Sequence, residues 1–169
     1  MHLYLIRHAD AVPLGERGIA TDEERPLTEA GRSQCRTLAK ALGRLGAKID
    51  RVLTSPLVRA RQTAEALRDG WGEGAPAVAE CPYLAPGAKK RKLLDRLREQ
   101  HVEALGLVGH NPDLSELVGW LVGSKKAGFN LEKAGVACVE FEGAPGKGCG
   151  TLAWVVTPPW CDAVAGPAG

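Results

Sequence analysis

The chain has 169 residues, 44% of them hydrophobic and 25% charged, which is typical of a globular protein long enough to bury a substantial core. The formal net charge of +2 is too small to indicate a nucleic-acid-binding protein. No apolar stretch approaches the ~18 residues that a membrane helix needs, and Met1 and His2 lead directly into an apolar run rather than a signal peptide. A cytoplasmic setting without membrane association is therefore expected.

Six short runs with strand character alternate with helical patterns along the chain. They cover residues 3–6, 51–54, 77–80, 104–108, 136–141 and 151–156. This alternation predicts an α/β fold, a three-layer sandwich with a mostly parallel central sheet and helices on both faces. The last two runs flank the glycine-rich segment EGAPGKGCG, which predicts an antiparallel strand pair at the C-terminal edge of the sheet.

Helices are predicted where a starting residue precedes apolar side chains at helical spacing. Thr28 is placed to cap a helix. Ser55-Pro56 and Asn111-Pro112 each place a capping residue before a proline at the first helical position. The apolar stripes that follow are Cys35, Leu38, Leu42 and Leu45, then Leu57, Ala60, Ala64 and Leu67, then Leu114, Leu117, Val118 and Leu121. One domain is expected over residues 1–160, followed by a flexible tail over 161–169.

The five cysteines are odd in number and scattered, with no C-x-x-C pair. This pattern favours neither a disulfide framework nor a zinc site. Cys35 lies at a helical core position and Cys138 lies in an apolar strand, so both are expected to be buried thiols.

Three of the predicted strands end where cationic or helix-starting residues begin. The first runs into Arg7 and His8, the second into TSPLVRARQTA, and the fourth into GHNPDLSE, which contains His110. Ligands bind at the carboxyl ends of parallel strands, and helix N-termini there favour anions. Two histidines and at least two arginines thus gather at one edge, which predicts a phosphate site.

A lone histidine or arginine at a strand end is most often a surface residue, and only the conjunction of three such ends favours a functional site. Helical periodicity leaves open whether Arg59 or Arg61 faces that edge, because both are neighbours of the core position Ala60. Three other polar residues are expected at the surface: His2, His101 and Asp10.

Four ordered segments, LIRHADA, ERPLTEAGRSQC, VLTSPLVRARQTAEAL and LVGHNPDLSELV, resemble the histidine phosphatase superfamily, whose fold is phosphoglycerate-mutase-like. Within it the chain is most similar to the small bacterial phosphohistidine phosphatases, from residue 1 to about residue 160. The resemblance implies that His8 is the phosphorylated nucleophile, that Arg7 and Arg59 bind phosphate, and that His110 is the second catalytic histidine. Asn111 would add a backbone N–H to the phosphate.

The implied reaction is hydrolysis of a phosphohistidine on a signalling or phosphotransfer protein. His8 attacks with an unprotonated nitrogen while its other nitrogen donates to a backbone carbonyl, and Arg7, Arg59 and a protonated His110 stabilise the charge. These cations take the role of a metal, so no metal and no cofactor are expected. The expected partner is a phosphohistidine-bearing protein, without nucleic acid or membrane, and the chain is expected to act as a monomer.

Two departures from the family pattern bear on the substrate. Ala9 stands where relatives commonly have glycine, a small change that should be tolerated. Many relatives that hydrolyse phosphate monoesters carry a carboxylic general acid, and the matching segments here read ECPYLAPG and HNPD. Glu80 is the candidate for that acid, and a plain surface carboxylate is the alternative reading. Two other functions therefore stay open: a phosphatase of small phosphate monoesters and a non-catalytic phosphoprotein-binding module.

Overall fold

The computed structural model describes residues 1–124 and 128–166. The strands are β1 (His2–Arg7), β2 (Arg51–Thr54), β3 (Ala77–Glu80), β4 (Ala104–Gly109), β5 (Val136–Glu140) and β6 (Thr151–Val156). The α-helices are α1 (Glu29–Arg44), α2 (Val58–Trp71), α3 (Lys90–Arg98), α4 (Asp113–Leu121) and α5 (Pro158–Ala165). Short 3-10 turns, η1 (Glu16–Gly18) and η2 (Pro82–Leu84), lie in the connecting segments.

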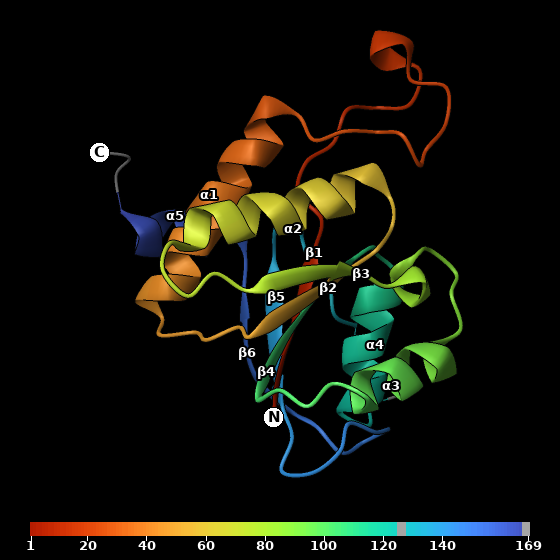
Figure 1. The fold of residues 1–169 in the computed structure, drawn as a ribbon, viewed down its shortest axis with the longest axis vertical. Coiled ribbons are helices and arrows are strands. Elements are labelled where there is room, and N and C mark those ends of the chain that lie inside the picture. The colour runs from red at the N-terminus through yellow and green to blue at the C-terminus, as the bar shows by residue number, and fades with distance from the viewer. Residues whose placement is uncertain (125–127, 167–169) are drawn as a thin grey trace.

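All of these strands join one sheet in the order β3-β2-β4-β1-β5-β6 (Figure 1). β1 is parallel to β4, and β2 is parallel to both β3 and β4, so β1 to β4 run in one direction. β5 is antiparallel to β1, and β6 is antiparallel to β5, which confirms the predicted antiparallel pair at the C-terminal edge. The carboxyl ends of β2, β4 and β1 consequently lie side by side at one edge of the sheet.

Helices cover both faces of the sheet, as the predicted α/β sandwich requires. Leu3 and Leu5 of β1 pack on one face against leucines of α3 and α4. Tyr4 and Ile6, which alternate with them along the strand, pack on the other face with residues of α1 and α2. Among the described residues, no helix is long and apolar enough to cross a bilayer.

The C-terminal segment differs from the prediction. Residues 158–165 form helix α5, so the expected flexible tail over 161–169 is wrong for residues 161–165, and residues 167–169 lie outside the described part of the chain. The helix packs beside α1 and buries Cys161 and Ala165 (Figure 1). Arg44 of α1 also donates from Nη1 to the Val164 carbonyl at 2.7 Å, which ties the two helices together.

Candidate active site

His8 follows the end of β1 and is only 7% exposed. Its Nδ1 lies 2.8 Å from the carbonyl oxygen of Ala9, and Arg59 Nε lies 3.2 Å from its Nε2. The carbonyl can only accept a hydrogen bond, and the guanidinium can only donate one. Both contacts are therefore satisfied by one neutral tautomer, with the proton on Nδ1 and a lone pair on Nε2.

The charge state of His8 agrees with this tautomer. Burial is the main cause that lowers the pKa of His8 to about 4. The bond to the Ala9 carbonyl acts in the opposite direction, and the nearby Arg59 and Arg7 guanidiniums add to the lowering. The ring is consequently neutral near pH 7, with Nε2 available to an electrophile.

Arg59 lies in the first turn of α2, and its side chain is buried against His8. Besides the bond to His8, it donates from Nη1 to the Asp22 carbonyl at 2.6 Å and from Nη2 to the Asp22 carboxylate at 2.8 Å. Arg61, in contrast, forms an ion pair with Glu80 at 3.2 Å between two exposed side chains. The structure thus places Arg59, and not Arg61, at the edge where β1 ends.

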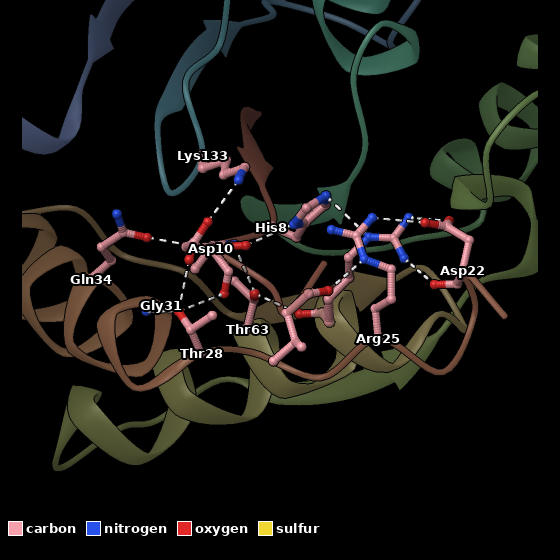
Figure 2. Close-up of polar contacts among 12 residues, drawn as sticks. His8, Asp10, Asp22, Arg25, Thr28, Gly31, Gln34, Thr63 and Lys133 are labelled. Carbon is pink, nitrogen blue, oxygen red and sulfur yellow. Dashed lines mark hydrogen bonds and ion pairs between the residues drawn. The ribbon is translucent and has the colours of Figure 1, made fainter. Parts of the chain in front are cut away.

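Asp22 is a site residue that the sequence did not reveal. It lies between β1 and α1, and its carboxylate accepts bonds from both Arg25 and Arg59 (Figure 2). Hydrogen bonds from Arg25 and Arg59 hold the pKa of the Asp22 carboxyl below its usual range. Three consecutive acidic residues stand at positions 22–24, and no spacing rule distinguishes the first of them.

His110 follows the end of β4 and is 3% exposed. Its ring centroid lies 5.0 Å from that of His8, with the ring planes inclined by 54°. Nε2 forms a hydrogen bond with Ser55 Oγ at 2.8 Å, whereas Nδ1 is buried without a partner. Burial, and then the neighbouring His8 and Arg59, lower the pKa of His110 to about 3. The ring is therefore neutral near pH 7, unlike the protonated form expected, because the Asp22 carboxylate offsets only part of this lowering.

Ser55 also has a different structural role from the helix cap that was predicted. Helix α2 begins at Val58 with Leu57 as the preceding residue, so Ser55 is not the helix cap. Its Oγ accepts a bond from the Leu57 N–H at 3.3 Å, two residues further on, and contacts His110 on the other side. The hydroxyl thereby links the end of β2 to the second histidine.

Arg7 and Asn111 hold the same loop carbonyl from adjacent strand ends. Arg7 Nη1 donates to the Leu131 carbonyl at 2.9 Å, and the Asn111 side chain donates to the same oxygen at 2.8 Å. Arg7 Nε is buried without a partner. Among the described side chains, the buried polar atoms that lack a hydrogen bond are this Nε and Nδ1 of His110, and both belong to one site. Buried N–H groups are costly to leave unpaired, so a pair of them marks a place for a ligand with acceptor atoms.

A second set of contacts fixes the segment after His8 (Figure 2). Thr63 of α2 accepts a bond from the Ala9 N–H at 3.1 Å and donates to the Arg59 carbonyl at 2.7 Å, so it connects the two functional elements. Asp10, expected to be a solvated loop residue, instead accepts bonds from Thr28 at 2.8 Å and from Lys133 at 2.7 Å. Thr28 caps α1, as predicted, by accepting the Gly31 N–H.

Glu80, the candidate general acid, ends β3 and is exposed. Its carboxylate contacts Arg61 on the surface of α2, and the structure does not bring it to His8, Arg59 or His110. The residues that the structure does bring together are His8, Arg7, Arg59 and His110, with Asp22 and Ser55 added to them.

Two arginines and two buried histidines lie together where β1, β2 and β4 end, with the histidine rings 5.0 Å apart. The comparisons with known proteins name the class of protein that carries this arrangement. The model of the histidine phosphatase superfamily (branch 1) matches residues 3–85, a stretch that includes Arg7, His8 and Arg59. The chain belongs to this superfamily.

The relatives of this chain match it over different shares of their own length. An uncharacterized protein of Picosynechococcus is 37% identical over 140 residues, which are 80% of this chain and 82% of that protein. The mitochondrial serine/threonine-protein phosphatase Pgam5 of Drosophila mojavensis is 40% identical over 87 residues, 52% of this chain but only 29% of that longer protein. Among solved structures, the protein histidine phosphatase SixA complexed with tungstate superposes with a TM-score of 0.80 at 27% identity, covering 94% of this chain and 98% of that one.

Proposed function

We propose that this chain is a metal-independent phosphohistidine phosphatase that hydrolyses phosphohistidine on a protein through a phosphorylated His8. The observation that supports this most directly is the pair of unpartnered buried nitrogens, Arg7 Nε and His110 Nδ1, beside a neutral histidine whose Nε2 carries a lone pair. The related SixA structure, which holds tungstate, a tetrahedral oxyanion like phosphate, also supports it.

In the first step, Nε2 of His8 attacks phosphorus in line with the substrate P–N bond. A new P–N bond forms to His8 as the old one breaks, and the electron pair of the broken bond leaves with the substrate imidazole. The Arg59 Nε–H loses its acceptor when the lone pair is used, and it turns to a phosphoryl oxygen. Arg7 Nε–H and His110 Nδ1 bind the other oxygens, so charge is stabilised by preorganised donors.

In the second step, water attacks the phosphorus of phospho-His8. The P–N bond to Nε2 breaks, His8 recovers its lone pair, and orthophosphate leaves with the oxygen of water. The His8 tautomer stays fixed through both steps by its Nδ1–H bond to the Ala9 carbonyl. The phosphoryl dianion also reverses the electrostatics around His110, because an adjacent negative charge raises a histidine pKa.

The substrate class follows from the carboxylates of the site. Asp22 is the carboxylate in contact with Arg59, and its bonds to Arg25 and Arg59 keep it ionised near neutral pH, so it is unsuited to donate a proton. Glu80 is paired with Arg61 away from His8. An imidazole leaving group, whose conjugate acid has a pKa of ~6.5, departs without an acid. An alkoxide, whose conjugate acid is about as weak as water with a pKa of ~15.7, does not.

The test compares kcat/KM near neutral pH for a phosphohistidine protein, an aryl phosphate and a phosphoserine protein. We expect efficiency to fall in that order, with the phosphoserine protein nearly inert. The Pgam5 relative, described as a serine/threonine-protein phosphatase, makes phosphoserine the necessary comparison. Equal turnover of phosphoserine would overturn the substrate assignment, and a loss confined to the ester substrates in Glu80→Gln would identify the acid.

Trapping tests the nucleophile separately. Brief reaction followed by quenching without acid should label His8, and His8→Asn should abolish both labelling and turnover. Label on His110, with His8→Asn still active, would reverse the roles.

Turnover should also survive exhaustive chelation, because Arg7, Arg59 and His110 take the role that a metal would have in binding the phosphoryl oxygens. Loss of turnover on chelation that magnesium or zinc restores would contradict metal independence.

A further inference from the structure

A second cluster of polar side chains lies at the opposite end of β1 from His8. His2 begins β1 and is paired in antiparallel register with Glu140 at the end of β5, and His2 Nδ1 lies 3.6 Å from Glu140 Oε1. Cys138 precedes Glu140 by two residues on β5, so both side chains project from the same face of the sheet. One ligand atom from each of the three residues lies within 4.8 Å of the others.

We propose that His2, Cys138 and Glu140 form a zinc site. An imidazole, a thiolate and a carboxylate are each ordinary zinc ligands, and two residues at i and i+2 on one strand plus one across from them converge on a single point. Ligand atoms around a tetrahedral zinc are about 3.3–3.7 Å apart, given bond lengths of about 2.0–2.3 Å. The cluster therefore needs to close by only about 1 Å.

The exposure of the three residues permits that closure. His2 and Glu140 are 49% and 50% exposed, so both side chains can rotate toward a cation while buried Cys138 stays fixed. His2 and Glu140 also line a surface groove together with Met1 and Phe141, so solvent reaches two of the three proposed ligands. Three protein ligands leave the fourth position of a tetrahedral ion to water.

Charge also favours a divalent cation. On binding, the Cys138 thiol gives its proton to solvent and forms the metal–sulfur bond, and thiolate and carboxylate together neutralise the two positive charges. The sulfur ligand selects against magnesium and calcium, which prefer oxygen.

The cluster stands apart from catalysis. His2 and His8 are six positions apart along the chain, which is about 20 Å at about 3.3 Å per residue of strand. A metal there would join β1 to β5 next to the bond between the Met1 amino group and the Phe141 carbonyl, and so act as a structural link.

The test uses the full chain without an affinity tag, equilibrated with zinc and then dialysed. We expect one zinc per chain, and each of His2→Gln, Glu140→Gln and Cys138→Ala should weaken zinc binding by at least about tenfold. Cobalt in place of zinc should give a thiolate-to-cobalt charge-transfer absorption that Cys138→Ala removes. The control variants Cys149→Ser, at an exposed thiol, and His8→Asn should keep both signals.

Two results would overturn the site: a wild-type chain that retains no zinc, or zinc that His2→Gln and Glu140→Gln leave in place. Because both of those residues are exposed, their variants fold even where Cys138→Ala does not. Phosphatase activity should be the same with and without zinc, so this test and the chelation test of catalysis fail independently.

Discussion

Ser55 determines where His110 carries its proton. Its oxygen accepts the Leu57 N–H, and among the contacts of the described residues its hydroxyl has no acceptor other than His110 Nε2. The hydroxyl proton therefore goes to Nε2, and neutral His110 keeps its own proton on Nδ1, the atom that has no partner in the protein. The serine at the end of the neighbouring strand β2 thus fixes the tautomer of His110, and in the proposed mechanism Nδ1 donates to a phosphoryl oxygen.

Replacing this serine should show the effect in turnover. In Ser55→Ala the proton of His110 can move to either nitrogen, and we expect kcat to fall by roughly 10- to 100-fold, as when a group that orients a functional histidine is lost. Steady-state kinetics with a phosphohistidine protein measures it, and nitrogen NMR of the ring reports the tautomer directly.

Thr54→Val is the matched control, because it removes a neighbouring buried hydroxyl that bonds the Ser55 carbonyl and not His110. A similar loss of kcat in both variants would mean that the Ser55 effect comes from packing rather than from proton placement.

The functional residues were predictable only where a strand end or a family motif marks them. Arg7, His8 and His110 follow strands, but Arg59 and Arg61 flank one core position at 100° per residue, and only tertiary contacts separate them. Asp22 and Ser55 act through side chains that chain folding brings in from other segments. No local pattern in the sequence records such contacts.

At the level of elements, the first turn of α1 is fitted closely to the segment that follows β1. A Cβ at Gly31 would overlap the backbone carbonyl oxygen of Asp10, while Thr28 in the same turn bonds the Asp10 side chain. The glycine is thus required by close approach of two backbones and not by its own dihedral angles.

Gly31→Ala should push α1 away from this segment. We expect the free energy of unfolding to fall by about 1–3 kcal/mol, the usual cost of overpacking, and activity to fall with it because His8 and Ala9 belong to the displaced segment. Urea denaturation gives the stability. Gly43→Ala on the same helix meets open space and should be neutral or stabilising by up to about 1 kcal/mol. Equal destabilisation by the two changes would refute the close-approach explanation.

Helix α5 shows why one element escaped prediction. Its sequence, PPWCDAVA, buries only Cys161 and Ala165, so it lacks the repeated large apolar side chains that mark a helix of this length. The strands were predictable because apolar runs such as that of β4, buried at every position, have one plausible place in an α/β sheet. A helix that buries only small side chains at the edge of the molecule has a weaker hydrophobic pattern in its sequence than an element of the core.

For the molecule as a whole, the two neutral histidines couple stability to pH. The pKa values of His8 and His110 lie near 4 and 3 in the folded chain, against ~6.5 when unfolded. Below pH 6.5 the unfolded chain binds protons that the folded chain does not. The free energy of unfolding therefore decreases as the pH is lowered. Each histidine contributes up to about 1.4 kcal/mol per pH unit in the range between the two values.

Chemical denaturation between pH 7 and pH 4.5, without phosphate, measures this slope. His8→Asn and His110→Asn should each reduce it, and His101→Asn, at an exposed histidine, should leave it unchanged. A slope that stays the same in all three variants would assign the acid sensitivity to carboxylates, such as Asp10 and Asp22, whose lowered pKa values act in the same direction at lower pH.

The bonds between Arg59 and Asp22 bear on what happens once the chemistry is over. In the proposed reaction orthophosphate is the product of every cycle. If all N–H groups of Arg59 were free, Arg59 and Arg7 together would bind this product tightly. Arg59 instead donates from Nη1 to the Asp22 carbonyl and from Nη2 to the Asp22 carboxylate. In the proposed mechanism only Arg59 Nε turns to the phosphoryl group, so the two Nη groups that Asp22 holds add little to the binding of the departing phosphate. Because these donors are already occupied, we expect orthophosphate to be a weak product inhibitor of this enzyme.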